Sequence, residues 1–236
     1  MKRKIAKVKN FVNWTSTLTQ LINRDAGIPG LGLIHGFTGA GKTTTVIASV
    51  NRFNGIYLRA TSVCTPTSQY RTLLRQLGIA PLSSAAKMLD AAVEYLLENP
   101  RPIFVDEADY LIKSAKLLDS WRDLHDLTSV PIVLIGMEGI AGKLVHRKQL
   151  SRRISQWLEF QPCDLADARL LTETCCEIEI HDDLLAHLHK QAKGSIGQMV
   201  VGLSRLESHA RTHRLKSLKL ATWQESNKKL FLGRAA

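Results

Sequence analysis

Gly-Phe-Thr-Gly-Ala-Gly-Lys-Thr, residues 36–43, matches the pattern Gly-x-x-x-x-Gly-Lys-[Ser/Thr] at every fixed position. The apolar residues Leu31, Leu33 and Ile34 precede it as a short buried strand, and a helix is predicted to begin at residues 44–50. In this context the stretch predicts a phosphate-binding loop, because its glycines let backbone N–H groups face phosphate oxygens at a helix N-terminus. A glycine-rich turn that binds nothing is the weaker interpretation.

The residues of this loop have distinct expected roles in binding ATP and Mg²⁺, the two predicted cofactors. The ammonium group of Lys42 would reach the β- and γ-phosphates and assist catalysis, and the Thr43 hydroxyl would ligate Mg²⁺. The predicted nucleotide-binding residues of the loop are Gly36, Phe37, Thr38, Gly39, Ala40, Gly41, Lys42, Thr43 and Thr44.

A second motif, Pro-Ile-Phe-Val-Asp-Glu-Ala-Asp at residues 102–109, is an apolar strand that ends in two carboxylates. Asp106 is predicted to hold Mg²⁺, usually through water, and Glu107 to orient and polarise the water that attacks the γ-phosphate. Such an acidic pair can instead cap a helix. Its occurrence together with an intact phosphate loop favours the catalytic role.

The remaining pattern predicts an α/β domain followed by a helical one. Further strands are expected at 55–59, 130–136 and 157–160, and helices at 10–24 and 84–98. A further helix is expected to start near Pro66 and to carry Tyr70, Leu73, Leu74 and Leu77. The strand at 130–136 is expected beside the phosphate-loop strand. From Asp164 onward the apolar spacing is helical throughout, with Asp164 and Thr222 as expected helix caps. The expected domains are a basic tail at 1–9, a nucleotide-binding domain at 10–162 and a helical lid at 163–236.

Composition indicates an anionic partner. The chain has 32 lysines and arginines against 21 aspartates and glutamates, a net charge of +11, and the excess is concentrated in the first nine residues and the C-terminal segment. Nucleic acid is the favoured partner because such residues neutralise phosphates without reading sequence. A merely solvated surface explains any single lysine better.

Other sequence features exclude several classes of protein. No apolar stretch is long enough to span a membrane, and the charged N-terminus lacks the apolar core of a secretion signal, so a cytoplasmic location is expected. The four cysteines show no metal-binding spacing and are predicted to be reduced thiols: Cys64, Cys163, Cys175 and Cys176.

Taken together, the two motifs, the basic region after residue 143 and the helical lid resemble the AAA+ superfamily, whose fold is a parallel sheet flanked by helices. Three phrases look like the DNA-transposition regulators of the MuB and TnsC type: Ile-Phe-Val-Asp-Glu-Ala-Asp-Tyr-Leu at 103–111, Val-Leu-Ile-Gly at 133–136 and Lys-Gly-Ser-Ile-Gly at 193–197. MuB itself carries an additional N-terminal DNA-binding region, so the resemblance is to its ATPase part.

The resemblance implies a protein that forms ATP-dependent helical homo-oligomers on double-stranded DNA without sequence preference and delivers that DNA to a transposase. It also implies DNA contacts from the segments that follow the second strand and its helix, where no aromatic side chain is available to stack on single-stranded bases. The residues expected to contact DNA backbone are Arg59, Thr61, Ser62, Thr65, Thr67, Arg71, Arg75 and Lys87.

Three further AAA+ positions follow from the resemblance. Arg152 or Arg153 matches the arginine finger that reaches a neighbouring subunit's γ-phosphate, with a basic helix face as the alternative. At the two sensor positions, where this superfamily carries polar or basic residues, the chain has Met137 and Gln198. Slow hydrolysis is therefore expected.

Other functions stay open at this point. A helicase loader of the DnaC or IstB type has the same fold and would prefer single-stranded DNA. A metabolic P-loop kinase would need an acceptor site, for which the sequence offers no feature. A nucleotide-gated binding module with negligible turnover would fit the two altered sensor positions.

Overall fold

The computed structural model describes residues 1–2 and 4–231 and divides into two compact units. One unit contains residues Met1–Asn13, Thr38–Gly41 and the chain from Gln161 onward, and the other contains Trp14–Phe37 and Lys42–Phe160. We call them the helical unit and the sheet unit. Among the described residues no helix is long and apolar enough to cross a bilayer.

The sheet unit is built on five parallel strands in the order β2-β3-β4-β1-β5. Their bounds are β1 Leu31–Gly36, β2 Ile56–Arg59, β3 Ile103–Asp106, β4 Ile132–Ile135 and β5 Ile154–Phe160. The prediction that the strand at 130–136 lies beside the phosphate-loop strand is confirmed, because β4 pairs with β1. The last strand begins at Ile154, earlier than the predicted residue 157.

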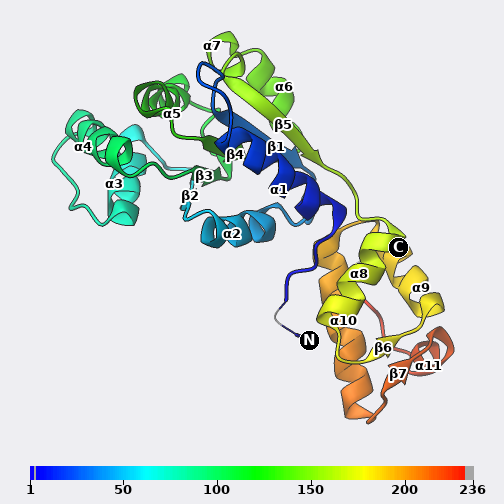
Figure 1. The fold of residues 1–236 in the computed structure, drawn as a ribbon. Helices are drawn as coiled ribbons and strands as arrows, with labels where there is room; N and C mark the ends of the chain where they lie inside the picture. Colours follow the sequence, from blue (N-terminus) through cyan, green and yellow to red (C-terminus); the bar gives the residue numbers. More distant parts are fainter. Residues whose placement is uncertain (3, 232–236) are drawn as a thin grey trace. The chain divides into compact units, whose positions relative to one another are not determined.

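Helices cover both faces of this sheet, as a fully parallel sheet requires (Figure 1). Their bounds are α1 Lys9–Ile22, α2 Lys42–Arg52, α3 Pro66–Leu77, α4 Ala85–Glu98, η1 Ala108–Tyr110 (a 3₁₀ helix), α5 Ala115–Thr128, α6 Ile140–Val145 and α7 Lys148–Ser151. The prediction that a helix starts near Pro66 is confirmed, because Pro66 is the first residue of α3. Thr65 caps this helix with a side-chain oxygen that accepts a hydrogen bond from the Ser68 N–H.

Alternation along the strands separates the two faces of the sheet. One face packs its aliphatic residues against α3, α4, α5, α6 and α7 in one hydrophobic core. On the opposite face, Trp14 of α1 meets Phe104 of β3 edge to face, with ring centroids 6.1 Å apart. The Trp14 indole N–H also donates to the Ser49 hydroxyl at 2.7 Å, which fixes α1 against α2. The phosphate loop leads directly into α2, one of the helices on this second face of the sheet.

Between Gln161 and Phe231, the described C-terminal part of the helical unit contains four helices and, contrary to the purely helical prediction, a two-stranded parallel sheet. The bounds are α8 Leu165–Cys175, β6 Glu179–Ile180, α9 Asp182–Ala192, α10 Ile196–Thr212, β7 Ser217–Leu218 and α11 Leu220–Glu225. Asp164 caps α8 as predicted. Thr222 does not cap the last helix, which begins at Leu220 with Lys219 as its N-cap.

The first residues of the chain are part of the helical unit and do not form a separate tail over residues 1–9. Ala6 and Val8 are buried in the core of this unit, and the Lys2 N–H donates to the Cys175 carbonyl at 2.7 Å. The basic residues Arg3 and Arg234, which also support the charge argument, lie outside the described residues. The four cysteines are free, and burial raises the pKa of the Cys163 and Cys176 thiols to about 12.

Candidate nucleotide-binding site

The phosphate loop connects β1 to α2 through backbone that only glycine adopts easily. Gly39 and Gly41 have φ of +87° and +89°, in the left-handed region where a Cβ atom would be strained. Lys42, the first residue of α2, bends back over the loop, and its ammonium donates to the carbonyls of Gly36 and Phe37 at 2.6 and 2.9 Å. Burial lowers the pKa of Lys42, and the nearby carboxylate of Asp106 opposes this effect. The lysine is therefore held at the position where phosphates are expected.

Asp106 and Thr43 form the candidate Mg²⁺ site. Asp106 is buried at the end of β3, and its Oδ2 accepts a hydrogen bond from the Thr43 hydroxyl at 2.8 Å. Its Oδ1 accepts from the N–H of Glu107 at 2.8 Å. One hydroxyl and one carboxylate, with phosphates and water completing the shell, is an oxygen donor set that suits Mg²⁺ in nucleotide sites. The predicted pairing of the two motifs is thus present in the structure.

Tyr57 of β2 is a third group on the same carboxylate, and it was absent from the sequence prediction. Its hydroxyl donates to Asp106 Oδ2 at 2.8 Å. Burial, followed by this hydrogen bond, raises the pKa of Tyr57. Tyr57 and Arg59 lie two residues apart on β2, so their side chains project from the same face of the sheet, which is also the face of Asp106.

Glu107, the candidate catalytic carboxylate, has an unusual backbone and an unexpected partner. Its φ is +56°, a left-handed conformation that costs a residue with a side chain about 1 kcal/mol. Its Oε1 accepts from Arg59 Nη2 at 3.2 Å, and both side chains reach solvent. A predicted DNA-contacting residue and the predicted water-orienting residue therefore form one ion pair.

The first sensor position is occupied by backbone rather than by a polar side chain. The Met137 N–H donates to Asp109 Oδ2 at 2.7 Å, and the Met137 side chain is exposed. On the neighbouring strand, Nδ1 of His35 is buried with no hydrogen-bond partner among the described residues, and burial lowers the pKa of this imidazole. His35 directly precedes the phosphate loop and was also not singled out from the sequence.

The second sensor position lies at the start of α10, in the helical unit. Ser195 caps this helix by accepting a hydrogen bond from the Gln198 N–H. Within the same unit the Gly197 N–H donates to the Gly39 carbonyl at 2.9 Å. Arg205, further along α10, donates to the Leu230 carbonyl at 2.6 Å, so it does not substitute for the arginine that the sensor position lacks.

The two candidate finger residues differ in their freedom to reach another molecule. Arg153 donates to Asp126 Oδ1 and to the Gln149 carbonyl, both at 2.8 Å. Arg152 is exposed and carries no ion pair among the described residues. Both border a surface hollow with Arg24 at the N-terminal ends of the strands. Of the two arginines, Arg152 is therefore the one whose guanidinium is not held by an internal carboxylate.

The residues expected to contact DNA fall on β2, the loop after it, and helices α3 and α4. Thr61 and Ser62 are exposed in the loop beside Val63, which is 83% exposed. Thr67 is half-buried. The predicted cations on α3 and α4 are exposed: Arg71, Arg75 and Lys87. The hydroxyl of Thr65 is already used in capping α3, so its first role is structural.

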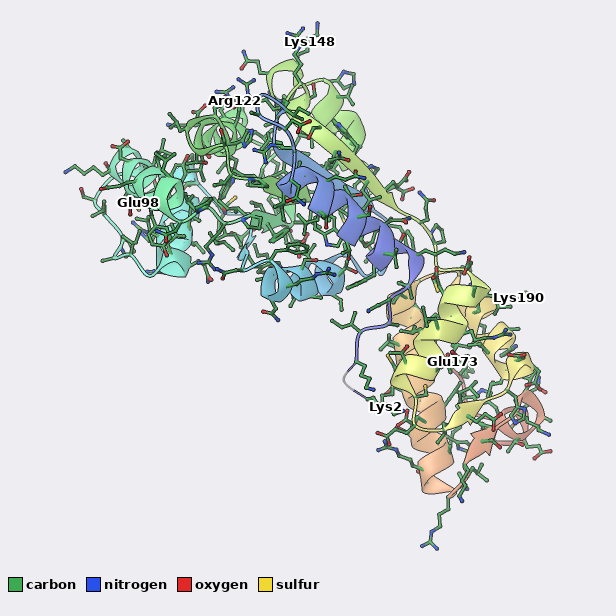
Figure 2. All side chains as sticks on the ribbon, in the orientation of Figure 1. Lys2, Glu98, Arg122, Lys148, Glu173 and Lys190 are labelled. Atoms are coloured by element: carbon green, nitrogen blue, oxygen red, sulfur yellow. The ribbon has the colours of Figure 1, made fainter. Side chains whose placement is uncertain are left out.

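Internal acids neutralise part of the basic surface. Arg122 of α5, labelled in Figure 2, donates to Asp119, Asp123 and Gln149. Arg169 and Arg211 of the helical unit are likewise paired with carboxylates. These arginines therefore contribute little to the net positive charge of +11, which belongs to the lysines and arginines that have no acidic partner.

A family model described as an AAA domain matches residues 27–144, half of the chain. This chain belongs to the AAA domain family. The matched segment contains the phosphate loop, the acidic pair and all strands of the five-stranded sheet except β5. No curated protein sequence matches the chain.

Solved structures with the same fold come from archaeal Orc and Cdc6 proteins. The ORC2 protein of Aeropyrum pernix, in ADPNP and ADP complexes, has a TM-score of 0.74 and 16% identity, over 96% of this chain and 70% of that one. Cdc6p of Pyrobaculum aerophilum has a TM-score of 0.70 and 16% identity, over 100% of this chain and 70% of that one. The ORC1 protein of Aeropyrum pernix in complex with DNA has a TM-score of 0.66 and 17% identity, over 92% of this chain and 63% of that one.

At these identities the structural similarity shows the fold alone. It confirms the predicted AAA+ architecture, with its parallel sheet, flanking helices and helical C-terminal region. The narrower MuB and TnsC type stays a prediction.

Proposed function

We propose that this AAA protein is an ATPase that binds double-stranded DNA without sequence preference, assembles on it as a helical homo-oligomer and delivers it to a transposase. The observation that carries the proposal is the ion pair between Arg59 and Glu107. It links a side chain suited to a DNA phosphate with the side chain suited to hydrolysis. The solved ORC1 structure with DNA, of similar fold, supports a DNA-associated role.

ATP binding and hydrolysis would use the residues gathered at the ends of β1 and β3. Lys42 is placed to exchange its two carbonyl partners for phosphate oxygens. Thr43 and Asp106 would hold Mg²⁺, which neutralises charge on the phosphates when bound. Glu107 would orient a water molecule and accept its proton, because its carboxylate is the solvent-reaching acid of the pair.

DNA would regulate this step through Arg59. A guanidinium binds phosphate as readily as carboxylate, in the same bidentate geometry. A DNA phosphate that captures Arg59 would therefore release Glu107 to orient water. Hydrolysis would then respond to DNA, and its outcome would be a change in DNA occupancy.

Assembly would complete the site from a second subunit. Arg152 is the favoured finger, because its guanidinium is not committed to an internal carboxylate while that of Arg153 is. An arginine supplied in trans makes hydrolysis depend on the oligomer. The exposed residues of α3 and α4 and the loop after β2 would contact the DNA backbone.

A nucleotide-gated module with negligible turnover is the second candidate. It is favoured by Met137, which offers its backbone N–H to Asp109 and no polar side chain to the nucleotide, and by Gln198 at the second sensor position. The measured hydrolysis rate on DNA separates this candidate from the first.

Electron microscopy of the purified protein with duplex DNA, with and without a non-hydrolysable ATP analogue, tests the proposal. We expect filaments only with the analogue, and none with the Lys42→Ala variant. Filaments or full DNA binding without nucleotide would refute the coupling. A preference for single-stranded DNA in the same experiment would favour a helicase loader, and pull-down of the transposase by DNA-bound filaments tests delivery.

A further inference from the structure

We propose that Tyr57 is a positioning residue for the Mg²⁺-nucleotide site: its hydroxyl fixes the carboxylate of Asp106 so that Asp106 and Thr43 bind the metal together. The inference rests on the proposed nucleotide-binding function and extends it to a strand outside both sequence motifs. It is carried by the 2.8 Å hydrogen bond from Tyr57 to Asp106.

The register of the sheet explains how Tyr57 reaches this carboxylate. β2 and β3 are parallel, with Tyr57 opposite Phe104 and Arg59 opposite Asp106. Residues that lie opposite one another share a face, so Tyr57 and Asp106 project from the same side of the sheet, offset by two residues along the strands. Two residues of strand rise about 6.6 Å, close to the length of a tyrosine side chain, so the hydroxyl arrives at the strand end. A phenylalanine would fill the same space but has no hydroxyl to donate a hydrogen bond to Asp106.

The hydrogen bonds at Asp106 fix its orientation at both oxygens. Oδ2 accepts from the hydroxyls of Thr43 and Tyr57, each at 2.8 Å, and Oδ1 accepts from a backbone N–H. An ionised carboxylate only accepts, so both hydroxyl protons point at it. The Thr43 oxygen then keeps its lone pairs for the metal. With Thr43 alone on Oδ2, the carboxylate could turn and carry the threonine hydroxyl with it.

The position is enclosed enough for this bond to matter. Asp106 is only 6% exposed, and Tyr57 is half-buried under the end of β3. Water is therefore a poor substitute for the tyrosine hydroxyl on Oδ2. Groups that orient metal ligands in this way typically change metal affinity by about 10- to 100-fold when removed.

The test is the Mg²⁺ dependence of nucleotide binding by the full chain. A fluorescent ADP analogue is titrated without Mg²⁺, and Mg²⁺ is then titrated into the complex. For Tyr57→Phe we expect unchanged affinity for the metal-free analogue and a half-saturating Mg²⁺ concentration raised about 10-fold. Because the defect is in affinity, excess Mg²⁺ should restore binding and most of the hydrolysis rate.

Tyr70→Phe is a matched control. Its hydroxyl is also buried and donates to a protein oxygen, the Ser120 carbonyl at 2.6 Å, but on the α3 side of the sheet. It should lower the melting temperature as much as Tyr57→Phe or more, and leave the Mg²⁺ titration unchanged. An equal shift in both variants would show a general loss of packing and overturn the proposal.

Failure of this inference is distinguishable from failure of the proposed function. If wild-type protein binds the analogue with a clear Mg²⁺ dependence that Tyr57→Phe retains unchanged, the positioning role is wrong while the nucleotide site stands. If wild-type protein binds no nucleotide, the proposed function itself is wrong, and the positioning role with it.

Discussion

Replacing Arg59 by alanine should change ATP hydrolysis and DNA binding in opposite directions. In the structure Arg59 holds Glu107 through a 3.2 Å ion pair, with the two side chains 66% and 35% exposed. Removing the arginine frees the catalytic carboxylate without DNA. Basal hydrolysis should therefore rise, DNA affinity should fall, and DNA should no longer stimulate hydrolysis.

The size of the rise follows from the exposure of the pair. Solvent-exposed ion pairs contribute about 0.2–1 kcal/mol. If that energy opposes release of Glu107, its loss raises the population of free carboxylate, and with it the basal rate, by about 1.4- to 5-fold. Loss of one phosphate contact should reduce the salt dependence of DNA affinity by about 0.9 in the slope of log K against log salt.

A steady-state ATPase assay with and without duplex DNA, combined with fluorescence anisotropy at several salt concentrations, measures both effects. Arg71→Ala is the control, because Arg71 is exposed on α3 and forms no ion pair in the described part of the chain. It should weaken DNA binding and leave the basal rate unchanged. A basal rate that is lowered or unchanged in Arg59→Ala, with DNA stimulation intact, would refute the proposal that the ion pair with Arg59 restrains Glu107.

The remaining predictions concern the catalytic carboxylate, the finger and one buried histidine. Glu107→Gln should retain ATP binding but lose at least about 100-fold in hydrolysis and prolong the lifetime of protein on DNA; an unchanged lifetime would show that hydrolysis does not drive release. Arg152→Ala should lower DNA-stimulated hydrolysis without loss of nucleotide affinity or melting temperature, whereas Arg153→Ala should also lower the melting temperature because it breaks the pair with Asp126; full activity in both variants would place the finger elsewhere. His125 is buried, its Nε2 accepts from the Gly30 N–H and its Nδ1 bonds the Val130 carbonyl, and burial lowers its pKa. The unfolded chain therefore takes up the proton at a higher pH than the folded protein, so the free energy of unfolding should fall as the pH drops below about 6.5, by up to about 1.4 kcal/mol per pH unit. A melting temperature that is constant from about pH 7.5 to 5.5 would contradict this.

The parts of the site that depend on short contiguous sequence could be predicted. The phosphate loop needs glycines at left-handed positions and a lysine at the helix start, and few other sequences satisfy both. Asp106 could be matched to Thr43 because the acidic motif occurs together with an intact phosphate loop, and the structure brings these residues, 63 apart in sequence, to 2.8 Å.

Partners supplied by neighbouring strands could not be predicted in the same way. Tyr57 in a short apolar strand is compatible with simple burial, since periodicity gives its face but not the group at the end of its side chain. Arg59 was assigned to DNA because the resemblance places DNA contacts after the second strand, and periodicity does not show that its guanidinium bonds Glu107. β6 and β7 were missed because strands of two residues are too short to show alternation. Thr222 was a plausible helix cap, but it lies within α11, which begins two residues earlier at Leu220.

β2 therefore has two functions that its sequence alone does not separate. Tyr57 and Arg59 lie two residues apart on this strand. Tyr57 bonds Asp106, the last residue of β3, and Arg59 bonds Glu107, the residue that follows it. The first contact is enclosed and should persist in every state, whereas the second is exposed and open to competition by a phosphate. A protein that must keep its nucleotide while it waits for DNA needs this difference. In the proposed function, the enclosed bond on Asp106 would preserve Mg²⁺ binding, and the exposed ion pair on Glu107 would delay hydrolysis until DNA binds.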